Sequence, residues 1–197
     1  MGKREEQRIS TKLAILAAFE RLCERSTYTH ISVADICEEA GISKPTFYRY
    51  FQSKDNIIRW LAKRAIEGGV AEIGRTYSWY EGYLRTMSIQ YKHRAFFCDE
   101  QSTAVVGSLF SFSSDYRRDN LVRAISETPG AQLTEKLSIQ IEALLVIESI
   151  ITRRWAVNGM QQEPAVIADY MASCVPHDLF KLLDNPREAP AETASEA

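Results

Sequence analysis

The sequence predicts an all-α protein in which a small N-terminal helix-turn-helix domain precedes a larger helical domain. Apolar residues recur at three- and four-residue spacing along most of the chain, and no segment shows the alternation or hairpin turns of strands. Gly41-Ile42-Ser43 separates two short helical segments, as in a helix-turn-helix. We expect domains at residues 1–64 and 65–184, followed by a disordered tail at 185–197 that is rich in Pro, Ala and Glu.

Composition argues against several classes of protein. Hydrophobic residues at 45% and charged residues at 25% are typical of a soluble globular chain. No apolar run approaches the roughly 18 to 20 residues of a membrane span, and the charged start MGKREEQRIS is unlike a secretory signal. The four cysteines and three histidines lack metal-ligand or disulfide spacing, and no catalytic motif is present. We expect a cytoplasmic protein that is not an enzyme and has no metal or cofactor.

Charge is unevenly distributed along the chain. Residues 1–64 hold 12 Lys and Arg against 8 Asp and Glu, whereas the remainder holds 12 against 18. A basic module joined to an acidic one fits a protein whose N-terminal part meets a polyanion. Chance variation in surface charge would explain the imbalance about as well.

Local signals place four N-terminal helices. An apolar stripe predicts a first helix at about 3–25. Ser32, with Asp35 three residues later, predicts the cap of a second helix at about 33–40. Gly41 suits a left-handed helix end, and Ser43 can cap a third helix at about 44–50 that carries Pro45 in its first turn. Ser53 is expected to cap a fourth helix, ending near Gly68-Gly69.

Beyond Gly69 the periodic runs predict only helices. The expected ranges are 71–92, 96–113, 115–127, 133–158 and 164–183. The clearest breaks are Thr128-Pro129-Gly130 and Asn158-Gly159.

Residues 31–54, ISVADICEEAGISKPTFYRYFQSK, resemble the DNA-binding signature of TetR-type repressors. The resemblance spans about residues 10–60, and its core pattern is A-G-x-S-x-x-T-F-Y-x-Y-F-x-S-K. Cys37 stands where alanine is common, and Ser26-Thr27-Tyr28 lacks a glycine often found before the second helix. The resemblance implies a dimeric regulator that binds a pseudopalindromic operator, whose second domain responds to a ligand.

The third helix carries the side chains expected to read DNA. In a helix-turn-helix the N-terminal turn of the recognition helix enters the major groove. There Lys44 could donate to guanine, Pro45 could pack on a thymine methyl group, and Thr46 could bind a base or a phosphate. Phenolic hydroxyls suit phosphate oxygens at the groove wall. The complete predicted set is Ser32, Val33, Ser43, Lys44, Pro45, Thr46, Tyr48, Tyr50 and Lys54.

Lys54 stands out because a cation in the first turn of a helix opposes the helix dipole. A bound phosphate would compensate for this cost. The alternative is an ordinary solvated lysine.

The two C-terminal helical segments, 133–158 and 164–183, are rich in apolar residues, the first almost all round its middle. Two such helices from each of two chains can form a four-helix dimer interface, which the resemblance also implies. The alternative is that they form only core within one chain.

Aromatic residues gather at 76–116 with a few polar ones, a mixture typical of a small-molecule pocket. We expect a small apolar or aromatic effector, with candidate pocket residues Trp79, Tyr83, Met87, Tyr91, Phe110 and Tyr116. In the main hypothesis this effector releases a repressor from DNA. In the alternative, a protein partner controls DNA binding, or the chain activates transcription.

Overall fold

The computed structural model describes residues 3–98 and 103–184, with side chains described at 4–98 and 114–184. Within these ranges every named element is a helix, and the one β contact is an isolated bridge between Ile73 and Tyr77. The all-α fold class is therefore confirmed. None of the described helices combines the length and the apolar character that a membrane crossing requires. The predicted disordered tail at 185–197 lies outside the described residues.

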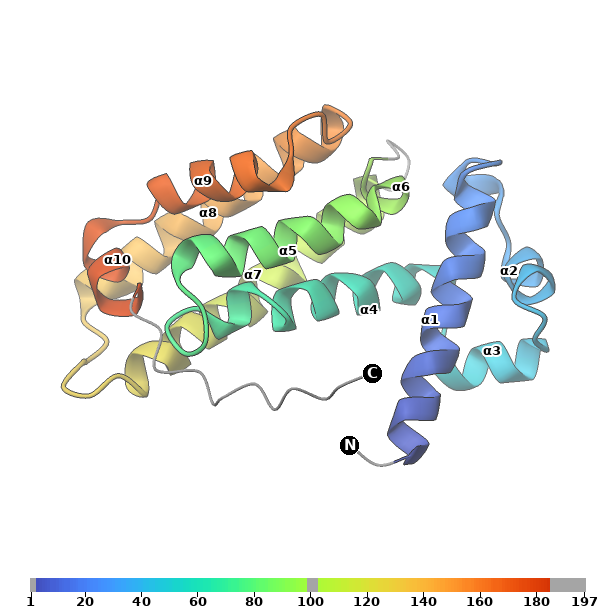
Figure 1. The fold of residues 1–197 in the computed structure, drawn as a ribbon, viewed down its shortest axis with the longest axis horizontal. Helices are drawn as coiled ribbons and strands as arrows, with labels where there is room; N and C mark the ends of the chain where they lie inside the picture. Colours follow the sequence, from blue (N-terminus) through green and yellow to red (C-terminus); the bar gives the residue numbers. More distant parts are fainter. Residues whose placement is uncertain (1–2, 99–102, 185–197) are drawn as a thin grey trace, which may run out of the picture.

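The N-terminal elements follow the sequence prediction closely. They are α1 (Lys3–Cys23), the 3₁₀ turn η1 (Tyr28–His30), α2 (Val33–Glu39) and α3 (Lys44–Tyr50). In Figure 1, α1 stands beside the pair α2 and α3 at one end of the molecule. Ser53 is the N-cap of the next helix as predicted, but its hydroxyl donates to Asn56 Oδ1 (3.1 Å) and caps no backbone N–H.

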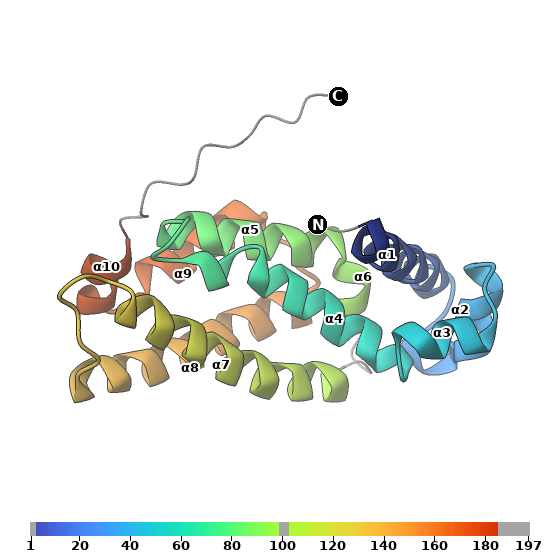
Figure 2. The same cartoon turned by 90° about the horizontal axis from the view of Figure 1, so that it is seen from below.

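The remaining helices form a layered bundle. They are α4 (Lys54–Glu67), the 3₁₀ turn η2 (Val70–Glu72), α5 (Trp79–Lys92), α6 (Arg94–Phe97), α7 (Thr103–Ser126), α8 (Glu135–Val157), α9 (Pro164–Ser173) and α10 (His177–Leu183). Figures 1 and 2 show α4 running from the α3 end into the bundle, while α8 and α9 lie on the side away from α4. The helix predicted at 133–158 is confirmed as α8.

Four predicted ranges in this part were wrong. The helix expected at 71–92 begins only at Trp79, after η2 and a loop that bends at Gly74 (φ 79°). In place of the two helices expected at 96–113 and 115–127, the structure has the four-residue helix α6 and one long helix, α7. The helix expected at 164–183 is divided into α9 and α10, because Pro176 stands as the N-cap of α10 and lacks the N–H that would continue α9.

Two clusters of buried side chains fill the interior. The N-terminal cluster packs α1, α2 and α3 around the first half of α4, and the second cluster fills the bundle. Along α4 the change from one cluster to the other falls between Ala62 and Ile66. Phe96 of α6 joins the N-terminal cluster, with its ring centroid 4.9 Å from that of Phe19. Helices α4 and α6 therefore connect the two parts, and the division after residue 64 stays a prediction.

Candidate functional site

The turn between α2 and α3 is fixed by local side chains. At the start of α2, Ser32 Oγ accepts from Asp35 N (3.2 Å) and the Asp35 carboxylate accepts from Ser32 N (2.7 Å), a complete capping box. The Ser32 hydrogen bonds also hold the pKa of Asp35 below its usual value. Gly41 adopts φ 64° after α2, and Ser43 Oγ accepts from Thr46 N (3.3 Å) at the start of α3. The predicted caps of both helices are thus confirmed.

Two phenylalanines tie α3 to the protein and turn its other face outward. Phe47 is fully buried and Phe51, directly after the helix, is 4% exposed. Lys44, Pro45 and Tyr48 are exposed, and 55% of Tyr48 is accessible. None of these three residues belongs to the described core clusters, although the Tyr48 ring packs T-shaped against the Phe47 ring at a centroid distance of 5.5 Å. The outward face of α3 is therefore accessible, as a recognition helix requires.

The other predicted contact residues differ in accessibility. Ser32 and Ser43 are exposed, although their hydroxyls act in the caps. Thr46 is half-buried and its hydroxyl lies 3.0 Å from Ser43 Oγ. Val33 and Tyr50 pack against the N-terminal cluster and are half-buried. The structure thus brings the set to one end of the molecule, and their DNA contacts stay predictions.

Lys54 has two partners inside the protein. Its ammonium donates to the carbonyl oxygens of Tyr28 (2.6 Å) and Ile31 (2.7 Å), and lies 4.2 Å from the centroid of the Tyr28 ring. The neighbouring Asp55 carboxylate accepts a hydrogen bond from the Tyr28 hydroxyl. The first turn of α4 is therefore bound to η1 and to Ile31, the residue that precedes the N-cap of α2. Sequence reasoning missed this connection, because the carbonyls lie 23 and 26 residues away.

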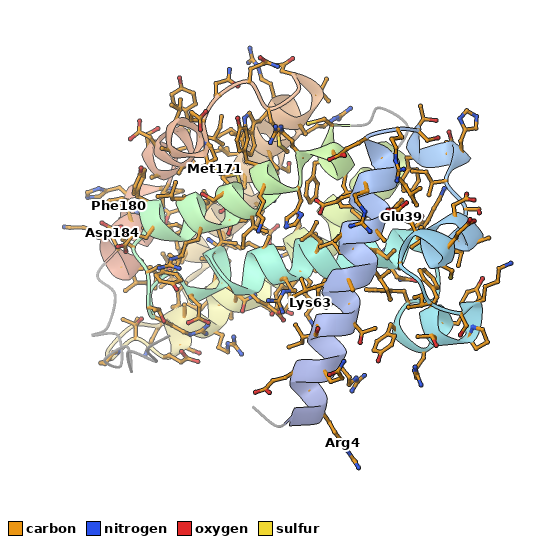
Figure 3. All side chains as sticks on the ribbon, turned by 45° about the vertical axis from the view of Figure 1, so that its right-hand side comes forward. Arg4, Glu39, Lys63, Met171, Phe180 and Asp184 are labelled. Carbon is orange, nitrogen blue, oxygen red and sulfur yellow. The ribbon has the colours of Figure 1, made fainter. Side chains whose placement is uncertain are left out.

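An ion-pair cluster joins α1 to α2. The Glu39 carboxylate accepts from Arg21 Nε (2.6 Å) and Arg25 Nη2 (2.7 Å), and these hydrogen bonds hold the pKa of Glu39 below its usual value. Figure 3 shows Glu39 at the end of α2 beside α1.

Arg49 is a further exposed cation on α3, stacked over the Tyr50 ring at 5.4 Å. It was absent from the predicted set, although arginine and tyrosine are both residue types that donate to phosphate oxygens in protein–DNA complexes.

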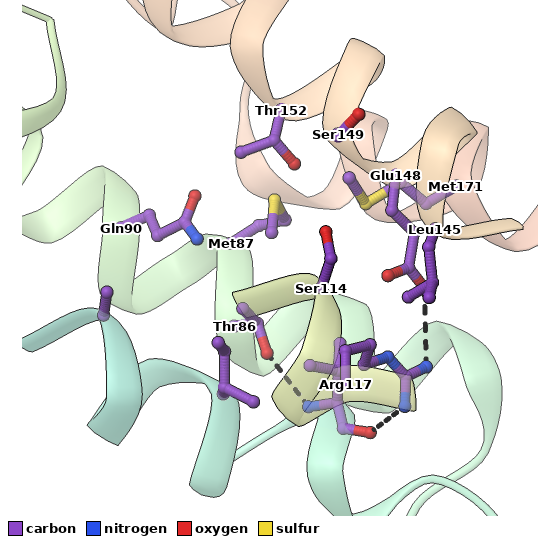
Figure 4. Close-up of a pocket in the computed structure, with 13 residues that line it drawn as sticks. Thr86, Met87, Gln90, Ser114, Arg117, Leu145, Glu148, Ser149, Thr152 and Met171 are labelled. Carbon is purple, nitrogen blue, oxygen red and sulfur yellow. Dashed lines mark hydrogen bonds and ion pairs between the residues drawn. The ribbon is translucent and has the colours of Figure 1, made fainter. Parts of the chain in front are cut away.

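A cavity opens between α4, α5, α7, α8 and α9 (Figure 4) and measures about 590 Å³, including the part open to solvent. Its described lining is Ala62, Ile66, Val70, Thr86, Met87, Gln90, Ser114, Arg117, Leu145, Glu148, Ser149, Thr152 and Met171. This lining is largely apolar with a few polar groups, the usual character of a small-molecule site.

Only one of the six predicted pocket residues, Met87, belongs to that described lining. Trp79 and Tyr83 are buried in the core of the bundle, and Tyr91 stacks on Trp155 with ring centroids 6.0 Å apart. The Tyr116 hydroxyl donates to Glu67 Oε1 (3.3 Å). The side chain of Phe110 lies outside the described residues. The four predicted aromatic residues with described side chains thus lie outside the described lining and make other contacts.

A buried ion pair forms one wall of the cavity. Arg117, 3% exposed, donates from Nη1 to Val70 O (2.7 Å) and from Nη2 to Glu148 Oε1 (3.4 Å). The same carboxylate oxygen accepts from the Tyr83 hydroxyl (2.6 Å). Burial, and then the nearby Glu148 carboxylate, raise the pKa of Tyr83 well above its usual value, so the phenol stays neutral.

Comparison with known proteins finds a family match in the N-terminal part. Residues 15–60 match the family model of the bacterial regulatory proteins, tetR family. The HTH-type transcriptional regulator EthR of Mycolicibacterium smegmatis is 49% identical over 59 residues, which cover 28% of this chain and 27% of that protein. The dhaKLM operon transcriptional activator DhaS of Lactococcus lactis is 36% identical over 75 residues, 38% of each chain. The chain thus aligns with well under half the length of these relatives.

Solved structures extend the similarity to the whole fold. The dihydroxyacetone kinase operon activator DhaS superposes with a TM-score of 0.66 at 18% identity, covering 90% of this chain and 99% of that one. A tetR-family transcriptional regulator from Streptomyces coelicolor gives a TM-score of 0.51 at 16% identity, covering 87% and 88%. At such identities the likeness concerns the fold, which is shared across both parts of the chain.

Proposed function

The chain belongs to the TetR family of helix-turn-helix transcriptional regulators, and from this premise we propose that it is a repressor. The proposed repressor is a homodimer that binds a pseudopalindromic operator and is released from it by a small molecule. The observation that carries DNA binding is the outward face of α3. Lys44, Pro45 and Tyr48 are exposed there, while Phe47 and Phe51 hold the helix to the core. We further propose that the chain works in the cytoplasm and has no catalytic activity, since the relatives are named as regulators.

The proposed DNA contacts are of two kinds. Lys44, Pro45 and Thr46 occupy the first turn of α3 and would meet base edges in the major groove. Tyr48, Tyr50 and Lys54, together with the caps Ser32 and Ser43 and the Val33 amide, would fix the register on phosphates. The basic surplus of residues 1–64 favours this orientation.

Dimerisation through α8 and α9 is supported by an exposed apolar stripe. Ile139, Val146, Ile150 and Val157 lie seven, four and seven residues apart on one face of α8, and each is more than half exposed. On α9, Tyr170 is a further large side chain that is 52% exposed. A row of exposed apolar side chains on a folded chain is typical of a protein–protein interface. A second copy suits it, because an operator with two half-sites needs two recognition helices about 34 Å apart.

Control by a small molecule is supported by the position of the cavity. Ala62 and Ile66 of α4 contribute to its lining. The same helix begins at Lys54, which is bonded to the residues before α2. A ligand that fills the cavity in only one position of α4 would favour that position and so move the DNA-binding helices.

Fluorescence anisotropy tests the DNA-binding proposal. The probe is labelled palindromic DNA from upstream of the chain's own gene, titrated at several salt concentrations with the wild type, with Lys44→Met/Tyr48→Phe, and with Lys181→Met. Lys181 is an exposed lysine on α10, at the far end of the molecule from α3 (Figure 1). We expect salt-dependent specific binding that the double variant weakens by at least about tenfold and Lys181→Met leaves unchanged. Equal loss in both variants, or no specific binding by the wild type, would refute the interface.

A second candidate is activation of transcription, with or without a protein partner. It is favoured by the fold similarity to DhaS, which is named as an operon activator. A reporter placed behind the operator separates the two roles, because a repressor lowers and an activator raises expression when the chain is present.

A further inference from the structure

Two buried polar atoms, each on a residue that lines the cavity, find no hydrogen-bond partner among the described residues. They are the acceptor Gln90 Oε1 on α5 and the donor Arg117 Nε on α7. A buried polar atom without a partner costs roughly 1–3 kcal/mol. A bound molecule that supplied the missing partners would recover this free energy, so the two atoms indicate which groups the cavity is built to bind.

The charges around the cavity are balanced. Arg117 is paired with Glu148, and the Glu148 carboxylate also accepts from the neutral Tyr83 phenol. An anionic ligand would meet the Glu148 carboxylate, and a cationic ligand would meet the Arg117 guanidinium, with no unpaired counter-charge in the described lining. Because moving an ion out of water is costly without such a partner, the cavity disfavours ionised ligands.

The polar atoms are separated by apolar surface. In Figure 4, Gln90 and Arg117 lie on different sides of the cavity, and Met87 extends into it beside Gln90. Leu145 and Met171 add apolar surface from α8 and α9. Thr152 faces the same space from α8 and offers a further hydroxyl group, whereas the Ser149 hydroxyl donates to Val146 O (2.8 Å) within α8.

We propose that the effector is a neutral molecule with an apolar middle and two separated oxygen functions, one a hydroxyl that donates to Gln90 Oε1 and one a hydroxyl or carbonyl oxygen that accepts from Arg117 Nε. This inference rests on the proposed function for its role as effector, but the ligand class follows from the cavity itself. It revises the apolar or aromatic effector expected from sequence, since Met87 is the only one of the six predicted residues in the described lining.

The test is isothermal titration of the purified full chain, without DNA, with four matched series of four to eight carbons. These are α,ω-alkanediols, 1-alkanols, n-alkanoates and n-alkylammonium ions. At the best chain length the diol should bind with a Kd about tenfold below that of the 1-alkanol, the effect of one further buried hydrogen bond. The two ions should bind more weakly still. Tighter binding of an ion, equal binding of diol and alkanol, or no binding in any series would each overturn the proposal.

Two variants locate the effect. Gln90→Leu should remove most of the advantage of the diol over the alkanol, while Ser88→Ala, an exposed change on the same helix, should retain it. Glu148→Gln removes the counter-charge of Arg117 and should raise alkanoate affinity at least about tenfold. A diol preference that survives Gln90→Leu, or unaltered alkanoate binding by a folded Glu148→Gln, would contradict the assignment.

The same ligands separate this inference from the proposed function. Diol binding that leaves operator affinity unchanged would refute effector control but not the ligand class. Operator binding that responds to alkanoates alone would refute the ligand class but not effector control.

Discussion

The Lys54 ammonium donates to the Tyr28 carbonyl oxygen at 2.6 Å and lies 4.2 Å from the centroid of the Tyr28 ring. Together with the bond to Ile31 O, this contact gives the cation at the start of α4 the compensation that its unfavourable position in the helix dipole requires. Two of the three ammonium N–H groups are thereby used, and one remains for a phosphate oxygen. Lys54 thus positions the helix-turn-helix, and in the proposed interface its third N–H would also contact a phosphate.

Replacing Lys54 by methionine should lower the free energy of unfolding by about 2 kcal/mol, because two hydrogen bonds from a charged donor are lost. It should also reduce the slope of log K against log salt for operator binding by about 0.9, the effect of one lost phosphate contact. Urea denaturation and anisotropy at several salt concentrations measure the two effects. The control Lys44→Met removes an exposed cation and should change stability by less than about 0.5 kcal/mol.

A Lys54→Met variant with reduced stability and an unchanged salt slope would mean that Lys54 acts only within the protein. The phosphate contact would then be withdrawn from the proposed interface.

Stability should fall at acidic pH through Glu39. Its bonds to Arg21 and Arg25 hold the pKa of the folded carboxyl below the ordinary value of 4.5. The unfolded state therefore binds the proton more readily, so the stabilisation is present above about pH 4.5 and is lost as pH falls through the folded pKa. Glu39→Gln should be less stable at pH 7 and should decline less below pH 4.5.

Urea titrations between pH 3.5 and 7 measure this dependence. Glu38→Gln changes the neighbouring exposed carboxylate and should follow the wild-type curve. If Glu39→Gln also follows that curve, the cluster between α1 and α2 does not contribute to acid sensitivity.

The helix-turn-helix could be predicted to within a residue because its signals are local. Ser32 and Ser43 cap the two helices, Gly41 adopts the left-handed conformation that the turn after α2 requires, and Pro45 is tolerated in a helix only in its first turn. The recognition helix was predicted at 44–50 and observed there. Each of these effects acts over three or four residues, so the surrounding protein does not change it.

Two of the wrong boundaries had signals in the sequence. Ser78 and Glu81 form a complete capping box at the start of α5, and Pro176 marks the break between α9 and α10. The continuous α7 had none, because its serine-rich stretch holds no residue that clearly ends or continues a helix. The cavity could not be predicted, since Arg117, Glu148 and Gln90 are brought to its lining only by tertiary packing.

Gly69 should tolerate no side chain, because it lies where the end of α4 meets α5. A Cβ built there would stand 2.7 Å from Gly82 O and 2.8 Å from Thr86 N, both backbone atoms that cannot swing aside. Gly69→Ala should lower the free energy of unfolding by about 3 kcal/mol. Gly130→Ala meets no atom within 4 Å and has only its φ of 76° to strain it, which costs about 1 kcal/mol. Equal losses in thermal or urea unfolding would contradict the close approach of α4 and α5.

The exposed stripe on α8 leads to a prediction about assembly. Ile150 is 59% exposed at the centre of the stripe, and across a twofold axis the same face of each copy meets its partner. Ile150→Glu should therefore place two carboxylates in one apolar interface and convert the dimer to a monomer in light scattering, because unpaired buried charges are strongly destabilising. Leu13→Glu, the same kind of change at an exposed leucine of α1, should leave the mass unchanged.

The monomer should also lose most of its operator affinity, although α3 and its contact residues are intact. One recognition helix then binds one half-site, and the gain from binding both half-sites together is lost. Operator binding of wild-type strength by a monomeric Ile150→Glu variant would mean that a single chain recognises its DNA, and that the stripe on α8 serves a different partner.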